Sequence, residues 1–183
     1  MEQTDSYRLD SDGLFRGNPG AMRTWTDRRI DPLTMTEDDV DVRDIAHALA
    51  RQCRYNGHTF GHLSVARHSL WVSNRLIDLG LTDLGLAGLL HDAAEAYTGD
   101  MIRPLKNHPA LGAAFAEVED HVEGVLAKYF DVPLGHPAIK EADNYVLLHI
   151  ELGGPQARYN WDSTYNADQS AWLAQFIALK GRL

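Results

Sequence analysis

A histidine and an aspartate stand side by side at His91 and Asp92, within the otherwise apolar stretch Leu89-Leu90-His91-Asp92-Ala93-Ala94. Polar groups on an apolar helical stretch are costly unless a partner satisfies them, and a divalent metal ion is a common partner for an imidazole beside a carboxylate. Taken alone, the pair fits a hydrogen-bonded core histidine beside a surface carboxylate. Further ligand types raise the case for a metal, because His68 lies 23 residues before His91 and Asp143 lies 51 residues after Asp92.

Two other histidines compete with His68 on residue type alone. His58 and His62 lie in the glycine- and histidine-rich loop that precedes the second expected helix. We favour His68 because it shares the inward helix face of Val65 and Val72. His58 is kept as a candidate on the substrate side.

The elements that must position these side chains are helices. Apolar residues recur at helical spacing over about 41–55, 64–79, 82–98, 109–130, 137–152 and 166–180, with Ser64 as a candidate N-cap. No strand-like alternation of useful length occurs. We therefore expect an all-α bundle of roughly six helices, forming a single domain over 1–183 in which 1–40 is an irregular N-terminal lead-in.

Charge and composition exclude some classes of protein. The 17 basic and 26 acidic residues give a formal net charge of −9. This charge argues against a protein that binds duplex nucleic acid through a basic surface, but not against one that binds a small anionic substrate. No apolar run approaches the roughly 20 residues of a membrane helix. The lone Cys53 and the absence of a signal-like N-terminus predict a cytoplasmic protein.

The chain resembles the HD-domain metal-dependent phosphohydrolases, in particular the small single-domain branch of 5′-deoxynucleotidases and phage-type deoxynucleotide hydrolases. The matching segments come in the family's order and span 45–49, 53–58, 64–69, 90–95 with 98–100, 103–106 and 141–143. Carried over position by position, the resemblance implies that one divalent ion, among Mn, Co, Mg, Zn, Fe and Ni, is held by His68, His91, Asp92 and Asp143. The fold it implies is a single HD domain.

The same resemblance assigns roles near the metal. Glu95, one turn beyond Asp92, matches the catalytic carboxylate, and Asp92 shares in catalysis as a ligand. Arg54 and Lys106 match positions that meet substrate phosphate, which suits a bidentate guanidinium and a point-charge ammonium. One departure is Arg67, where many relatives carry Glu or Gln before the metal histidine.

Three further side chains are candidates for substrate contact. Tyr55 could pack on a sugar or base, with plain core packing as the alternative. Asp100 could meet a sugar hydroxyl or support the ligands, with an ordinary turn carboxylate as the alternative. Trp25 would lie near a base if the N-terminal arm folds over the pocket.

The expected function is metal-dependent hydrolysis of a phosphate ester or anhydride of a deoxynucleoside mono- or triphosphate, with a small-molecule nucleotide as partner. One alternative is a cyclic-dinucleotide phosphodiesterase, although the Gly-Tyr-Pro signature and additional histidines of that branch are missing. The other is a catalytically dead helical binding module. Apolar Trp172 and Phe176 predict a homo-oligomer if they are exposed.

Overall fold

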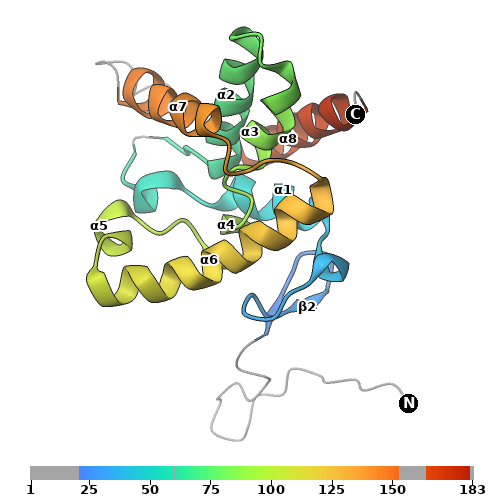
Figure 1. Ribbon diagram of the computed structural model, residues 1–183, viewed down its shortest axis with the longest axis vertical. Coiled ribbons are helices and arrows are strands. Elements are labelled where there is room, and N and C mark those ends of the chain that lie inside the picture. Colours follow the sequence, from blue (N-terminus) through green and yellow to red (C-terminus); the bar gives the residue numbers. More distant parts are fainter. Residues whose placement is uncertain (1–20, 60, 153–163, 182–183) are drawn as a thin grey trace, which may run out of the picture.

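The computed structural model describes residues 21–59, 61–152 and 164–181, and this part of the chain is predominantly helical (Figure 1). The all-α class expected from the sequence is confirmed. Six α-helices of six residues or more are described: α1 (Val42–Arg51), α2 (Val65–Asp78), α3 (Gly85–Leu90), α6 (Pro109–Phe130), α7 (Pro137–Tyr145) and α8 (Tyr165–Lys180). Shorter elements connect them, namely α4 (Glu95–Thr98), α5 (Arg103–Lys106), the 3₁₀ turns η1 (Glu37–Asp39), η2 (Arg54–Gly57) and η3 (Thr82–Leu84), and the π-helix η4 (Val146–Glu151).

The described part of the expected lead-in is more regular than predicted. Strands β1 (Met22–Arg23) and β2 (Arg29–Ile30) form an antiparallel pair, and Ile30, Met35 and Val40 are buried in the main core. Residues 21–40 thus include short ordered elements, and two-residue strands are too short to show alternation in the sequence. Residues 1–20 lie outside the described part.

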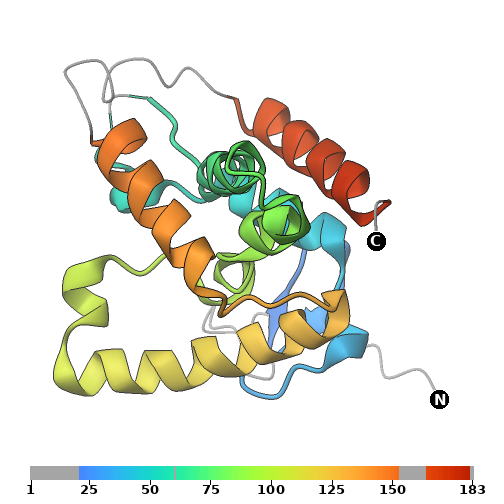
Figure 2. The same ribbon diagram turned by 45° about the horizontal axis from the view of Figure 1, so that its top comes forward.

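Helices α2 and α3 form the antiparallel pair on which the site depends, and they lie side by side in Figure 2. Helix α2 begins as predicted, since Ser64 Oγ accepts a hydrogen bond from the Arg67 backbone nitrogen at 3.0 Å. A Cβ on Gly88 would lie 2.4 Å from Leu76 Cδ1 and 3.3 Å from Ser73 Cα, so a larger residue here would require the buried Leu76 side chain to shift. The pairing sets the start of α2 beside the end of α3.

Two expected helices are interrupted where the site lies. The predicted 82–98 helix ends at Leu90, passes through turns at 91–94, and resumes as α4 until Gly99, whose φ is 83°. The predicted 137–152 helix changes from α7 into the π-helix η4. Periodicity detects the apolar faces of such segments but not a local change of helical pitch.

Helix α8, near the C-terminal end of the chain, packs against both α2 and α3. Trp172 is fully buried there and stacks on Phe176 at a centroid distance of 5.8 Å. The expectation of a homo-oligomer depended on exposure of these residues, and burial of Trp172 removes its basis. Across the described residues, no helix combines the length and the apolar character needed to cross a bilayer.

Candidate metal centre

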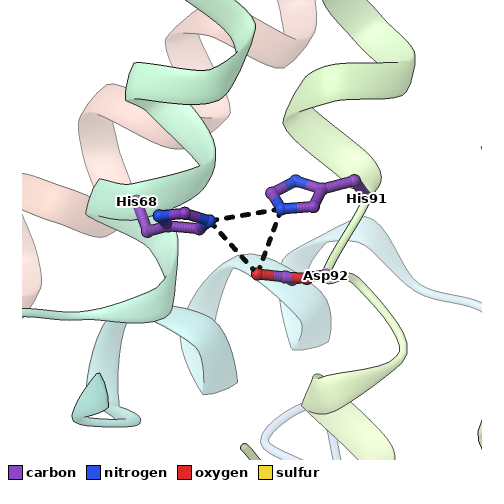
Figure 3. A group of neighbouring side chains, drawn as sticks. All are labelled: His68, His91 and Asp92. Carbon is purple, nitrogen blue, oxygen red and sulfur yellow. Dashed lines mark hydrogen bonds and ion pairs between the residues drawn. The ribbon is translucent and has the colours of Figure 1, made fainter. Parts of the chain in front are cut away.

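Three of the predicted ligands converge on one point (Figure 3). His68 comes from the first turn of α2, and His91 and Asp92 come from the turn that follows α3. The Nε2 atoms of the two histidines lie 3.3 Å apart, and Asp92 Oδ2 lies 3.6 Å from His68 Nε2 and 3.2 Å from His91 Nε2. Two imidazole nitrogens and one carboxylate oxygen thus form a compact triangle.

Asp143 completes the predicted set from α7. Its Oδ1 lies 3.2 Å from His68 Nε2, and its Oδ2 accepts a hydrogen bond from Lys140 Nζ at 2.6 Å. The His68 and Lys140 hydrogen bonds hold the pKa of Asp143 well below its usual range, against the opposing effect of burial. The structure therefore clusters three of the four side chains that the sequence named as ligands and places the fourth, Asp143, against His68.

The donor set fits a divalent ion. Nitrogen and oxygen ligands bound about 2.0 to 2.2 Å from one ion lie roughly 3.0 to 3.5 Å from their neighbours, by the geometry of the coordination sphere. The distances among His68, His91 and Asp92 are 3.2 to 3.6 Å. Two histidines with two carboxylates suit borderline to hard divalent ions such as Mn²⁺, Fe²⁺, Co²⁺ or Zn²⁺.

A further residue, Glu151, supports the site and was missed by the sequence analysis. Its Oε1 lies 2.7 Å from His68 Nδ1, and both side chains are fully buried. A carboxylate on Nδ1 fixes the ring orientation and leaves Nε2 available to a metal. On a regular α-helix Glu151 would lie about 80° around from Asp143, eight residues earlier. The π-helix turns less per residue, so no periodic signal in the sequence could have placed both on His68.

Arg54 and Tyr55 also contact Glu151. The Tyr55 hydroxyl donates to Glu151 Oε2 at 2.6 Å, and Arg54 Nε lies 3.1 Å from Glu151 Oε1, while a terminal guanidinium nitrogen lies 3.6 Å from Asp92. Tyr55 holds a left-handed backbone conformation, with φ of 56°, to reach this position. Both had been expected to meet substrate. The structure places them behind the ligands, where they neutralise and orient buried carboxylates.

A cavity of about 310 Å³ opens beside His91 and Asp92. Glu95 lines it, is buried, and has one carboxyl oxygen, Oε2, with no hydrogen-bond partner in the described structure. Burial and the negative charges of Asp92 and Asp100 raise the pKa of Glu95 far above its usual value. Glu95 is therefore placed to hold a proton at the cavity wall.

Lys106 lines the same cavity but is already paired. Its Nζ donates to Glu119 Oε1 at 2.8 Å and lies 3.9 Å from Glu95 Oε1. A Cβ on Gly112 would lie 1.9 Å from the Lys106 carbonyl oxygen, so this glycine permits the tight α5–α6 turn that aims the lysine. Glu119 and Glu123 of α6 were not singled out from the sequence, although they line the cavity.

The remaining predicted residues lie apart from the open cavity. His58 is exposed at the end of η2, and half-buried Asp100 has its pKa raised by burial against the opposing charge of Arg54. His62 contacts the Ala50 carbonyl at 2.8 Å, so it does not compete with His68 as a ligand. Arg67 pairs with Asp168 of α8 at 2.5 Å and serves helix packing, not the metal centre.

Trp25 does not fold over the metal site. It stacks on His47 of α1 and lines a separate cavity. The condition for Trp25 to lie near a base in the metal site, an arm folded over that pocket, is not met, because Thr26 is bonded to buried Asp44 of α1 and holds the hairpin there.

No protein-family model matches the chain. The chain is similar to an uncharacterized protein of Rhodobacter capsulatus, with 40% identity over 132 residues that cover 66% of each protein. It is also similar to the uncharacterized protein YfdR of Escherichia coli, with 32% identity over 114 residues, 62% of this chain and 60% of YfdR. The match thus spans just under two thirds of the first relative's length and less of the second, and neither name states an activity.

Proposed function

We propose that this protein is a metal-dependent phosphohydrolase of the HD-domain type that acts on a deoxynucleotide. The observation that carries the proposal is the cluster of His68, His91 and Asp92, with Asp143 against His68, beside a cavity that His91, Asp92, Asp143 and Glu95 line. A purely structural histidine pair would not need a cavity beside it, nor an unpartnered buried carboxyl oxygen facing the same region.

Glu95 and Lys106 have different roles in the proposed reaction. A divalent ion would supply Lewis acidity, which activates water and neutralises phosphoryl oxygens. Glu95 holds a proton because its pKa is raised by burial, and it is suited to protonate the leaving oxygen. Lys106, held between Glu95 and Glu119, adds a positive charge at the wall where a phosphoryl group would lie.

The charges around the cavity favour a substrate with one phosphoryl group. Five carboxyl groups line it, and only Glu95 among them is assigned a proton above: Asp92, Glu95, Glu119, Glu123 and Asp143. Both lysines on the wall are paired with carboxylates, Lys106 at 2.8 Å and Lys140 at 2.6 Å. Each additional phosphoryl group brings negative charge that this wall repels. We therefore favour a deoxynucleoside monophosphate over a triphosphate.

A substrate panel tests the proposal. The purified chain is assayed for bound metal and then incubated with Mn²⁺, Co²⁺ or Mg²⁺ and the mono-, di- and triphosphates of each deoxynucleoside. We expect inorganic phosphate from the monophosphates. Release of inorganic triphosphate would instead identify a deoxynucleoside triphosphate as the substrate. Absence of both metal binding and turnover would favour a dead helical module instead.

A further inference from the structure

Helix α4, which begins at Glu95, is a single turn of four residues, Glu95–Thr98. Isolated helices of this length are not stable in water, so contacts from the rest of the fold must hold the turn in place. The N-cap residue, Ala94, has no polar side chain with which to cap it. The Gly99 backbone nitrogen bonds the Glu95 carbonyl at 2.8 Å, which closes the turn but does not attach it to another element. The place of the Glu95 carboxyl therefore depends on what anchors α4 from outside.

Gln52 supplies such an anchor. Its side-chain Nε2 donates a hydrogen bond of 2.7 Å to the Glu95 backbone oxygen, across 43 residues. A backbone carbonyl only accepts hydrogen bonds, so the amide must present its nitrogen at this end. Gln52 Oε1 then lies buried with no hydrogen-bond partner within the described residues. The amide is thus held in this orientation by its bond to Glu95 and not by a second bond at its other oxygen.

The backbone of Gln52 is attached to the helix that carries a candidate ligand. Gln52 is the C-cap residue of α1, and its carbonyl accepts a hydrogen bond of 3.1 Å from the nitrogen of Val65, the first residue of α2. His68 lies three residues further along α2. One residue therefore joins two parts of the site, since its backbone holds the start of the His68 helix and its side chain holds the first residue of α4.

We propose that Gln52 is a positioning residue, which sets the place of the Glu95 carboxyl relative to the candidate metal ligands. The inference rests on the proposed hydrolase function, because it gives Gln52 a role in turnover through Glu95. Gln52 lines neither of the two described cavities, so it does not meet substrate itself. Proton transfer requires the donor within hydrogen-bond reach of the acceptor, and a displacement of about 1 Å can lower a rate about a hundredfold.

The kinetics of Gln52→Met with a deoxynucleoside monophosphate test the proposal, since this change keeps the length of the side chain and removes the donor. We expect kcat to fall at least about tenfold while KM and metal affinity stay within about twofold, because only the proton-transferring group moves. In a Glu95→Gln background the same change should alter the residual kcat by less than about twofold, since the positioned group is already gone. Gln175→Met, at a half-buried glutamine of α8 that bonds Ser73 and Asn74, is the matched control and should change nothing.

Amide hydrogen exchange gives a readout that does not depend on turnover. Loss of the Gln52 bond should speed exchange of the Gly99 amide, which bonds the Glu95 carbonyl, at least about fivefold. Amides in the middle of α2 should exchange as before. Gln52→Asn retracts the amide by one methylene and should show the same effects on kcat and exchange if Gln52→Met proves unstable.

Three outcomes would overturn the proposal. They are unchanged kcat and exchange in both Gln52 variants, an equal fractional loss of kcat in the Glu95→Gln background, and a fall in metal affinity as large as the fall in kcat. A lack of phosphate release by the unaltered protein would count against the proposed hydrolase function, and the Gly99 exchange rate would still decide whether Gln52 holds Glu95 in place.

Discussion

The two cavities beside α4 have nearly equal volumes, about 310 and 320 Å³, but opposite chemistry. The first is walled by carboxylates, histidines and paired lysines, and the second by a stacked indole and imidazole. A cluster of like charges close together is unfavourable unless a cation or a proton compensates it. A cation would therefore compensate the carboxylates of the first cavity, whereas in the second the Asp44 carboxylate is already bonded to Thr26.

The largest expected effect comes from removing one candidate metal ligand, which should abolish the chemistry of the first cavity and leave the second cavity intact. Asp92→Asn takes away one metal-facing oxygen and leaves His68 and His91 with no charge partner in the triangle. We expect loss of bound metal and a fall in phosphate release of at least about a thousandfold, because the Lewis acid is lost. Elemental analysis and the phosphate assay measure both effects.

The carboxyl of Glu95 should matter for turnover but not for metal. Glu95→Gln keeps the size of the side chain and removes its transferable proton, so kcat should fall by about 10² to 10⁴. Metal content should equal that of the unaltered protein. Ser73→Ala, in a buried side chain away from both cavities, is a matched control for burial. Normal turnover by Glu95→Gln would assign proton transfer to another group.

Glu151 supplies a subtler test of how the ion-binding cavity is organised. Glu151→Gln still offers an acceptor to His68 Nδ1 but removes the charge that Arg54 and Tyr55 surround. We expect metal affinity to fall about 10- to 100-fold, as for other residues that support a metal-bound histidine. Competition with a chelating dye measures it. Glu141→Gln, an exposed change on the preceding helix, should have no effect, and equal losses in both variants would indicate general destabilisation.

The smallest expected effect concerns the acidic wall of α6. Burial, with the nearby Glu119 and Asp120 carboxylates, raises the pKa of Glu123 from 4.5 to about 7. The folded state thus keeps a proton that the unfolded state has lost, so wild-type stability falls as pH rises from about 4.5 to 7. Glu123→Gln should match wild type at pH 4 and exceed it by about 1 kcal/mol at pH 8, after allowance for solvent screening. Urea unfolding at the two pH values measures the difference, and an equal change at both would contradict it.

Sequence reasoning succeeded where local pattern was sufficient. The Ser64 cap and the bounds of α6 follow from residue types that act within a few positions. The choice of His68 over His62 also held, because its apolar neighbours Val65 and Val72 put it on the inward face of α2. Three of the four residues named as candidate ligands form one cluster, with the fourth, Asp143, against His68.

The same reasoning failed where a contact joins distant segments. Glu151 bonds His68 across 83 residues, and it reaches the ring only because α7 continues as a π-helix. The pairing of Arg54 and Tyr55 with Glu151 was likewise invisible in the sequence, which offered both as candidates for substrate contact. The position of Trp25 on α1 could not be predicted either, since it depends on the Thr26 bonds to Asp44.

The sequence by itself determined that this is a helical protein and named two histidines and two carboxylates as candidate metal ligands, because amphipathic periodicity and residue chemistry are local properties. The tertiary structure decided which groups surround those ligands. It placed Glu151 behind His68, Glu119 against Lys106, and an aromatic cavity beside α4. Such contacts depend on close approach of helices and on a local change of pitch, which packing of the whole chain imposes.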